Sequence, residues 1–201
     1  MRKIVVTNSV TLDGVMQAPG APDEDRRGGF EHGGWARAYN DPVMMQAMGK
    51  GMAQGADLLF GRRTYESFFA VWPGRKDNPF TAVLDNAEKL VASRTLREPL
   101  PWRNSTLLFG DAAETVAKVK GQPGKDVVVL GSGDLLQTLM RHGLVDVYLL
   151  LIHPLVLGRG RRLFNDDGQR TALRLVDSVT TTTGVVMATY HPERTDPREG
   201  R

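Results

Sequence analysis

The sequence predicts an α/β fold: a central, mostly parallel sheet with an antiparallel C-terminal edge hairpin. Short β-rich runs alternate with helix-like segments along the 201 residues, the pattern of a sheet covered by helices. The run Val145–Ile152 is almost continuously apolar, as expected of a strand covered on both faces. The stretch Leu173–Tyr190 lacks a helical pattern and predicts a hairpin that turns at Thr183-Gly184.

The predicted elements follow one another without a linker. The expected strands are Ile4–Val10, Leu58–Phe60, Leu90–Ser93, Thr106–Phe109, Val127–Leu130, Val145–Ile152 and Val185–Tyr190. Helices are expected to start at Asp41-Pro42, at Thr64, and at Asp134, where Gln137 three residues later resembles a capping box. No repeat divides the chain, so residues 1–191 predict one domain and the polar residues 192–201 a flexible tail.

The composition excludes several classes of site and partner. The chain has no cysteine, which excludes disulfides, thiol nucleophiles and thiolate metal sites. Its 26 Lys and Arg residues barely exceed its 23 Asp and Glu residues, so we expect no nucleic-acid partner. The apolar runs are too short for a signal peptide or a membrane span, so we expect a cytoplasmic protein with no membrane partner. Its four histidines lack metal-ligand spacing, and we expect no metal.

Two strand-glycine-helix junctions are candidate anion sites. Gly61-Arg62-Arg63-Thr64 follows one strand, and Gly131-Ser132-Gly133-Asp134, continuing to Leu135, follows another. A glycine turn before a helix directs backbone N–H groups and a positive helix end at a phosphate. The second junction is neither a Walker loop nor a complete Rossmann fingerprint, because Leu136 occupies the place of the third glycine. Each junction is also compatible with an ordinary capped helix.

Three further segments end strands with polar groups. Ser93-Arg94-Thr95 suits the 2′-phosphate of NADP, although an ordinary polar turn has the same composition. In Thr11-Leu12-Asp13-Gly14, the Asp13 carboxylate is suited to binding a heterocycle or assisting protonation, but Asp-Gly pairs also form simple turns. The Gly/Arg segment Leu157–Phe164 is either a substrate-phosphate loop or a solvated loop.

Two features of the N-terminal third are candidates for substrate contact. The segment Ala18–Trp35 is long and rich in Gly, Pro and charge, and it predicts a lid. Trp35 and Tyr39 are candidates to stack on a flat ring or to anchor the loop. Met44, Met48 and Met52 share one face of the expected helix, where they form either core or a soft substrate wall.

These motifs together resemble the dihydrofolate reductase-like family. Leu58–Glu66 resembles the Gly-Arg-x-Thr-x-Glu segment of dihydrofolate reductases, and the segments at Ser93 and Gly131 are similar to their 2′-phosphate and glycine-helix segments. The Asp13 and His153–Phe164 segments resemble instead the reductase domain of the riboflavin-biosynthesis deaminase-reductase and stand-alone bacterial dihydrofolate reductase family proteins. The similarity runs from about Lys3 to Tyr190.

The resemblance implies a three-layer fold with about eight or nine strands, an NADPH cofactor and a homodimer. It places Gly61, Arg62, Arg63, Thr64, Gly131, Ser132, Gly133, Asp134 and Leu135 at the cofactor phosphates, and Ser93, Arg94 and Thr95 at the 2′-phosphate. The pterin-binding acid of dihydrofolate reductases has no clear counterpart. Asp13 is the best alternative, as catalytic and substrate-binding residue, and Asp41 and Trp35 are further candidates for substrate contact.

Three functions remain open from the sequence. The leading hypothesis is an NADPH-dependent reductase resembling 5-amino-6-(5-phosphoribosylamino)uracil reductase, with a small heterocyclic or ribosylamino substrate. The second is a dihydrofolate or pterin reductase. The third is a nucleotide-binding regulatory protein that keeps the cofactor site without turnover.

Overall fold

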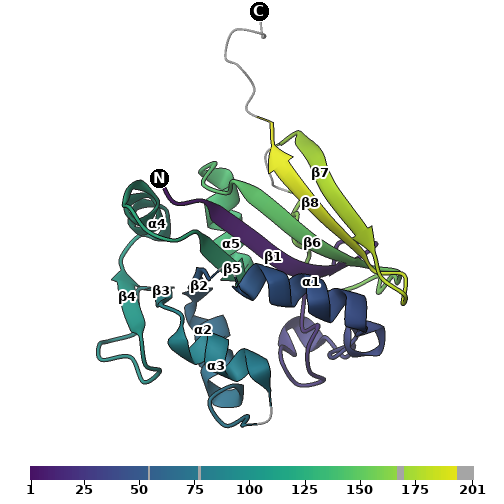
Figure 1. Cartoon of the computed structure of the whole chain (residues 1–201), viewed down its shortest axis with the longest axis horizontal. Coiled ribbons are helices and arrows are strands. Elements are labelled where there is room, and N and C mark those ends of the chain that lie inside the picture. Colours follow the sequence, from purple (N-terminus) through teal and green to yellow (C-terminus); the bar gives the residue numbers. More distant parts are fainter. Residues whose placement is uncertain (54, 77, 167–169, 194–201) are drawn as a thin grey trace, which may run out of the picture.

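The α/β prediction is confirmed by a computed structural model, which describes residues 1–53, 55–76, 78–166 and 170–193. One eight-stranded sheet runs through the molecule in the order β4-β3-β2-β5-β1-β6-β8-β7 (Figure 1). The strands are β1 Ile4–Thr11, β2 Asp57–Gly61, β3 Lys89–Ser93, β4 Ser105–Phe109, β5 Val127–Leu130, β6 Val147–His153, β7 Leu173–Thr180 and β8 Val186–Pro192. β1 to β6 are mutually parallel, whereas β8 pairs antiparallel with β6 and β7 antiparallel with β8.

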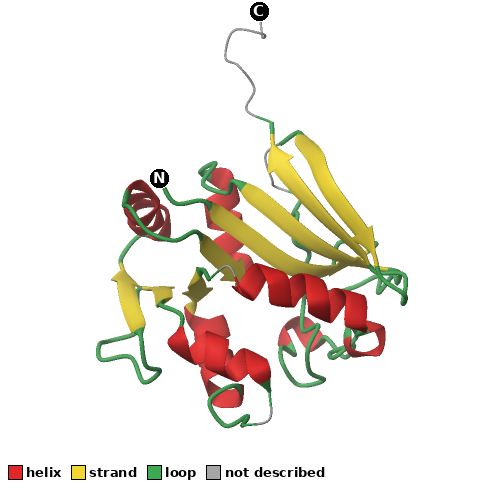
Figure 2. Ribbon diagram, in the orientation of Figure 1, coloured by secondary structure: helices red, strands yellow, loops and turns green. Residues whose placement is uncertain are grey.

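Helices cover both faces of the sheet and make three layers (Figure 2). The helices are α1 Pro42–Ala53, α2 Arg62–Val71, α3 Pro79–Asn86, α4 Ala112–Gly121 and α5 Gly133–Arg141, with short 3-10 turns at Arg27–Gly29 and Arg37–Tyr39. Successive side chains of β2 point to opposite faces of the sheet. Leu59 packs with the α4 and α5 side chains, whereas Leu58 and Phe60 pack with those of α2 and α3. Figure 1 shows α1 in front of the sheet and α5 behind it.

The helix starts agree with the sequence only at α1. Asp41 caps this helix, accepting a hydrogen bond from the Met44 backbone N–H at 2.8 Å. The starts expected at Thr64 and Asp134 are wrong, because α2 begins at Arg62 directly after β2 and α5 begins at Gly133 after Ser132. Both strands run into their helices without a side-chain cap, and the side chains of Thr64 and Asp134 instead contact neighbouring segments.

The C-terminal hairpin is present and extends slightly beyond the expected domain boundary. Its turn closes where the Gly184 N–H donates to the Thr181 carbonyl at 3.1 Å. β8 continues to Pro192, and the Glu193 N–H donates to the Ala172 carbonyl at 2.8 Å, where the sequence places the start of the tail. The remainder of that tail, 194–201, lies outside the described residues. In the described part of the chain, no helix has the length and apolar character needed to cross a membrane.

Candidate cofactor and substrate cleft

The N-termini of α2 and α5 are joined side by side at the carboxyl edge of the sheet. The Gly61 N–H donates to Ser132 Oγ at 3.0 Å, and the Ser132 N–H donates to Thr64 Oγ1 at 3.1 Å. Each junction therefore supplies a side-chain acceptor to the backbone of the other. Two positive helix ends in one place form a strong electrostatic site for an anion.

The turn before α5 requires unusual backbone geometry. Gly131 and Ser132 both have left-handed conformations, with φ of +56° and +58°. A Cβ added at Gly131 would lie 3.4 Å from Thr64 Cγ2, in close contact, and the positive φ would strain the backbone of any other residue there. The absence of a side chain at this position leaves room for the backbone of the turn to approach a ligand.

A cleft of about 1360 Å³ opens at this edge of the sheet. One part is apolar and lies between helices of the same face: Met44, Met45 and Met48 of α1, Phe68 of α2, Trp72 just after it, and Phe80 and Leu84 of α3. The other part is charged and mainly basic. Six arginines line it, Arg26, Arg27, Arg63, Arg141, Arg161 and Arg162, together with five acidic residues, Glu24, Asp25, Glu66, Asp134 and Asp166. The cleft can therefore receive a ligand with both a phosphate and a ring. Across the described ranges, no group of three or more His, Asp or Glu side chains is arranged to hold a metal ion.

Asp134 gathers three of these arginines at the start of α5. Its carboxylate pairs with Arg161, and it lies 3.6 Å from the Arg63 guanidinium and 3.7 Å from that of Arg27. The four side chains are between 40% and 65% exposed, so solvent screens each pair and a ligand can compete for them. The three arginine side chains can therefore turn toward a phosphate without unfolding the segments that carry them.

The expected lid borders the cleft and is fastened by Gln17. The Gln17 side chain is buried, and its amide N–H groups donate to the carbonyls of Asp25 at 3.1 Å and Arg27 at 3.0 Å. Its Oε1 accepts the Arg161 backbone N–H at 3.0 Å. Ala18, Pro19 and residues 24–27 line the cleft. One amide therefore links the lid to the Gly/Arg segment.

Trp35 anchors the lid from within and is not among the residues that line the cleft. Its side chain is buried with Val15, Ala18 and Phe30, and its indole N–H donates to the Gln17 carbonyl at 2.7 Å. Its ring packs edge-on against His153, with the centroids 5.1 Å apart. The geometry thus favours the loop-anchor interpretation over stacking on a substrate.

Asp13 also lies away from the cleft lining, and its carboxylate is fully engaged. It accepts the Thr11 hydroxyl at 2.5 Å and the backbone N–H groups of Leu157 at 3.2 Å and Gly158 at 2.8 Å. These bonds, led by that of Thr11, lower the pKa of Asp13. A carboxylate held in its ionised form in this way binds two loops together and is poorly suited to donating a proton.

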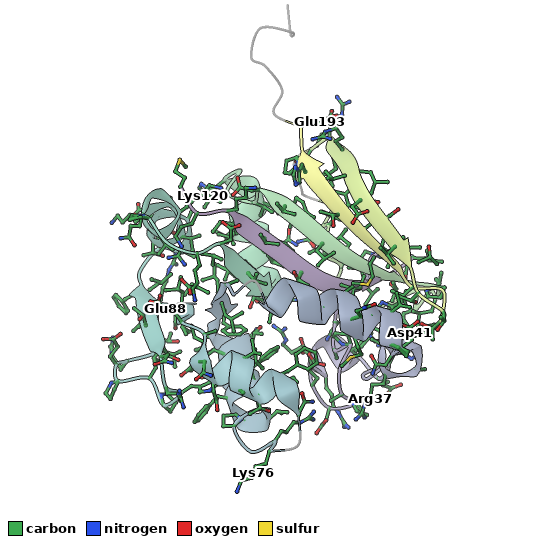
Figure 3. All side chains as sticks on the ribbon, in the orientation of Figure 1. Arg37, Asp41, Lys76, Glu88, Lys120 and Glu193 are labelled. Atoms are coloured by element: carbon green, nitrogen blue, oxygen red, sulfur yellow. The ribbon has the colours of Figure 1, made fainter. Side chains whose placement is uncertain are left out.

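Asp41 joins α1 to the tip of the β7–β8 hairpin, as its position in Figure 3 shows. In addition to capping α1, it accepts the Thr182 hydroxyl at 2.9 Å and the Thr183 N–H at 3.2 Å. Hydrogen bonding, chiefly from the Met44 N–H, lowers the pKa of Asp41 to about 2. Asp41 does not line the cleft. It is therefore placed to stabilise the fold, and a substrate in the cleft would not meet it.

The predicted cofactor residues divide into two groups. Arg63, Thr64, Gly131, Ser132, Gly133 and Asp134 line the cleft. Gly61 bonds to Ser132 beside it, Leu135 is buried in the core, and Arg62 lies 3.8 Å from Glu66 on the α2 surface. Arg62 and Leu135 are therefore outside the cleft lining, although Glu66, the partner of Arg62, is part of it.

The 93–95 segment lies at the same sheet edge, at the end of β3 and two strands away from β5. Ser93 Oγ accepts the backbone N–H groups of Thr95 and Leu96, each at 3.1 Å. The Arg94 guanidinium is 72% exposed and lies 3.0 Å from Asp111. None of the three residues lines the cleft, so Arg94 could bind only a phosphate that extends beyond it along the sheet edge, in exchange for Asp111.

Sequence reasoning missed Asn8 and Gln17. Asn8 follows Ile4 and Val6 in the inward-facing alternation of β1, and a polar residue in that series was the available signal. Gln17 carried no signal, because its partners are backbone groups of two separate loops. Arg161 belongs to the Gly/Arg segment, and its place in the cleft lining favours the substrate-phosphate interpretation of that segment over a solvated loop.

Comparison with known proteins supports a single family. The uncharacterized protein YyaP of Bacillus subtilis (strain 168) is 32% identical over 195 residues, covering 94% of this chain and 95% of YyaP. A crystal structure of a putative riboflavin biosynthesis protein from Shewanella sp. PV-4 superposes with a TM-score of 0.67 at 21% identity, covering 96% of this chain and 99% of that one.

More distant structures share the fold. Enterococcus faecalis dihydrofolate reductase complexed with NADP(H) and RAB-propyl gives a TM-score of 0.59 at 14% identity, covering 96% of this chain and 97% of that one. Acinetobacter baumannii RibD gives 0.62 at 15% identity, covering 96% of this chain and 59% of that longer one. The model of the RibD C-terminal domain matches residues 2–187. The chain therefore belongs to the RibD C-terminal domain family and has the dihydrofolate reductase-like fold that its sequence predicts.

Proposed function

We propose that this protein is a cytoplasmic NADPH-dependent reductase of the riboflavin-pathway type, acting on a small heterocyclic or ribosylamino substrate. The observation that carries the proposal is the joining of the α2 and α5 N-termini through Thr64 and Ser132 at the rim of an arginine-lined cleft. Family membership and the NADP(H) complex of the dihydrofolate reductase of similar fold support the choice of cofactor.

The residues at the cleft fit a dinucleotide. The 131–133 backbone, Thr64 and Arg63 would hold the pyrophosphate, since all of them line the cleft at the helix N-termini. Arg94 and Ser93 would hold the 2′-phosphate at the end of β3. When bound, NADPH supplies the hydride. The chain orients the two ligands, and its apolar wall excludes water from the ring site.

The geometry favours a pyrimidine or ribosylamino substrate over a pterin. Dihydrofolate reductases bind their substrate through a carboxylate, but Asp13 and Asp41, the candidates for this role, are engaged outside the cleft lining. In the apolar part, α1 presents Met44, Met45 and Met48. These apolar side chains suit a flat, uncharged ring. We assign Asp13 to holding the loops, with no part in proton transfer.

Fluorescence titration with NADPH and NADH tests the cofactor, with tighter binding of NADPH expected. Absence of binding, or equal affinity for both, would contradict the proposal. Turnover of 5-amino-6-(5-phosphoribosylamino)uracil and of dihydrofolate should then be followed by absorbance. Oxidation with dihydrofolate alone would favour the pterin alternative, and tight binding without turnover on either would favour a regulatory protein.

We also propose that a second copy of this chain covers β7. This edge strand exposes Leu175, Val176 and Val179 by 52%, 46% and 41%, and an open apolar strand edge is prone to pair with another chain. Light scattering after size exclusion should report a dimer, and Val179→Lys should shift it to a folded monomer, as judged by circular dichroism. A monomeric wild-type protein would contradict the dimer.

A further inference from the structure

Asn8 is a buried polar residue in the middle of the sheet. It is 6% exposed and occupies β1, the central strand between β5 and β6. Its Nδ2 is shielded from solvent and has no hydrogen-bond partner among the described residues. Buried amide donors are nearly always paired, so a group without a protein partner indicates that a partner comes from elsewhere.

The orientation of the Asn8 amide is determined by its neighbour. The Gly131 backbone N–H donates to Asn8 Oδ1 at 3.0 Å. Because an N–H requires an acceptor, the oxygen must face Gly131 and the amide nitrogen must face the other way. Asn8 therefore offers two N–H donors in a fixed direction and no free acceptor there.

Asn8 lies where the cleft meets the sheet. The pairing of β1 with β5 ends at Thr7 and Leu130, so Asn8 is one residue beyond the end of β5 and beside the 131–133 turn. Asn8 lines the cleft, together with Thr7 and Ser9 of the same strand. In the alternation of β1 its side chain shares a face of the sheet with Ile4 and Val6, the face that α5 covers, and it lies beside the turn that starts this helix.

We propose that Asn8 is a ligand-positioning residue whose Nδ2 donates to a carbonyl oxygen of the bound ligand. This inference rests on the proposed function and specifies which chemical group of the ligand the cleft recognises. Two ligands of the proposed reaction carry such an oxygen: the nicotinamide carboxamide of the cofactor and the pyrimidine ring of the substrate. A donor that is already oriented and desolvated discriminates strongly, since a ligand without an acceptor leaves it unpaired.

Asn8→Asp removes the amide donors and keeps an acceptor for the Gly131 N–H. The carboxylate replaces Nδ2 with a negative oxygen that repels a carbonyl. Burial of the new carboxylate also lowers the melting temperature, so binding is measured at a temperature at which circular dichroism shows the variant folded, and we expect affinity or KM weakened about 10- to 100-fold. Asn165→Asp is the matched control, because it adds the same charge at an exposed residue of the cleft and measures the purely electrostatic part.

A second measurement compares two cofactors. In the thionicotinamide analogue of NADPH, sulfur replaces the carboxamide oxygen and is a weaker acceptor. If Asn8 donates to the cofactor carboxamide, the wild-type protein binds NADPH more tightly than the analogue, and Asn8→Asp loses that preference. If Asn8 donates to the substrate ring instead, the wild-type protein and Asn8→Asp each bind NADPH and its analogue with equal affinity. In that case only the KM for the pyrimidine rises in Asn8→Asp.

The outcomes separate this inference from the proposed function. Equal cofactor affinity and equal substrate KM in wild type and Asn8→Asp would overturn the inference and leave the reductase proposal standing. The inference also fails if Asn165→Asp weakens both ligands as much as Asn8→Asp does. A wild-type protein that binds neither NADPH nor the pyrimidine would overturn the proposed function, and this inference with it.

Discussion

The Ser132 backbone N–H donates to the Thr64 hydroxyl at 3.1 Å, which joins two helix N-termini that are 68 residues apart in the chain. Thr64→Val keeps the shape of the side chain and removes the acceptor, leaving a part-buried N–H unpaired. We expect a loss of about 1–2 kcal/mol in the free energy of unfolding and weaker NADPH binding. Urea denaturation and cofactor titration measure the two effects. Thr64→Ser, which keeps the hydroxyl, should retain both properties, and Thr64→Val behaving like wild type would contradict the role of this bond.

Arg94 should distinguish the two nicotinamide cofactors. Arg94→Ala is expected to weaken NADPH about 10-fold or more and to leave NADH almost unchanged, because only the 2′-phosphate would use the guanidinium. Arg97→Ala, in the same exposed segment, is the matched control and should have little effect on either cofactor. Equal losses for NADPH and NADH on Arg94→Ala would place Arg94 elsewhere in the site.

Asp41 should make a pH-dependent contribution to stability. Its pKa is lowered from about 3.8 to about 2, so the carboxylate stabilises the folded state at neutral pH, and this contribution is lost as pH falls from about 4 through about 2. The stability difference between wild type and Asp41→Ala should therefore shrink over that interval. Asn can still cap α1 but carries no charge. The stability of Asp41→Asn should therefore lack the pH-dependent contribution that Asp41 makes between about pH 4 and about pH 2. Urea midpoints measured across the interval provide the comparison, and a constant difference would refute the assignment.

Lys89 is expected to be essential to the end of α3. Its fully buried ammonium donates to the carbonyls of Leu84 and Ala87, each at 2.8 Å, and lies 4.8 Å from the centre of the Trp102 ring. Lys89→Met should lower the free energy of unfolding by about 2–3 kcal/mol, since the helix carbonyls lose their donor. Lys118→Met, at an exposed position of α4, controls for removal of a charge and should be nearly neutral. Chemical denaturation of both variants tests the difference.

The fold and the cofactor side of the cleft were predictable because their signals are local. Alternating strands and helices indicated the layers, and the glycines at 61 and 131 marked the two turns at which helix N-termini meet. The substrate side depended on contacts between distant segments. The Asp13 carboxylate binds backbone groups at positions 157 and 158, so nothing near it in the sequence indicated that it was already engaged.

The same dependence on distant contacts explains the errors at the helix starts. Thr64 and Asp134 are residue types that cap helices, and local pattern favoured that role for each. In the folded chain, Thr64 bonds to Ser132, and Asp134 pairs with Arg161 of a loop 27 residues further on. Asn8 shows the opposite case: a local departure from the apolar alternation of β1 was visible, but its meaning depended on Gly131, 123 residues away.

The Gln17 amide links residues 25–27 and Arg161 through three hydrogen bonds, so the two borders of the cleft cannot move independently. Each of these bonds is made to a backbone group, so a shift of the backbone at Arg161 would be passed through Gln17 to the segment that carries Arg27. A substitution at Gln17 would therefore loosen both borders of the cleft at once.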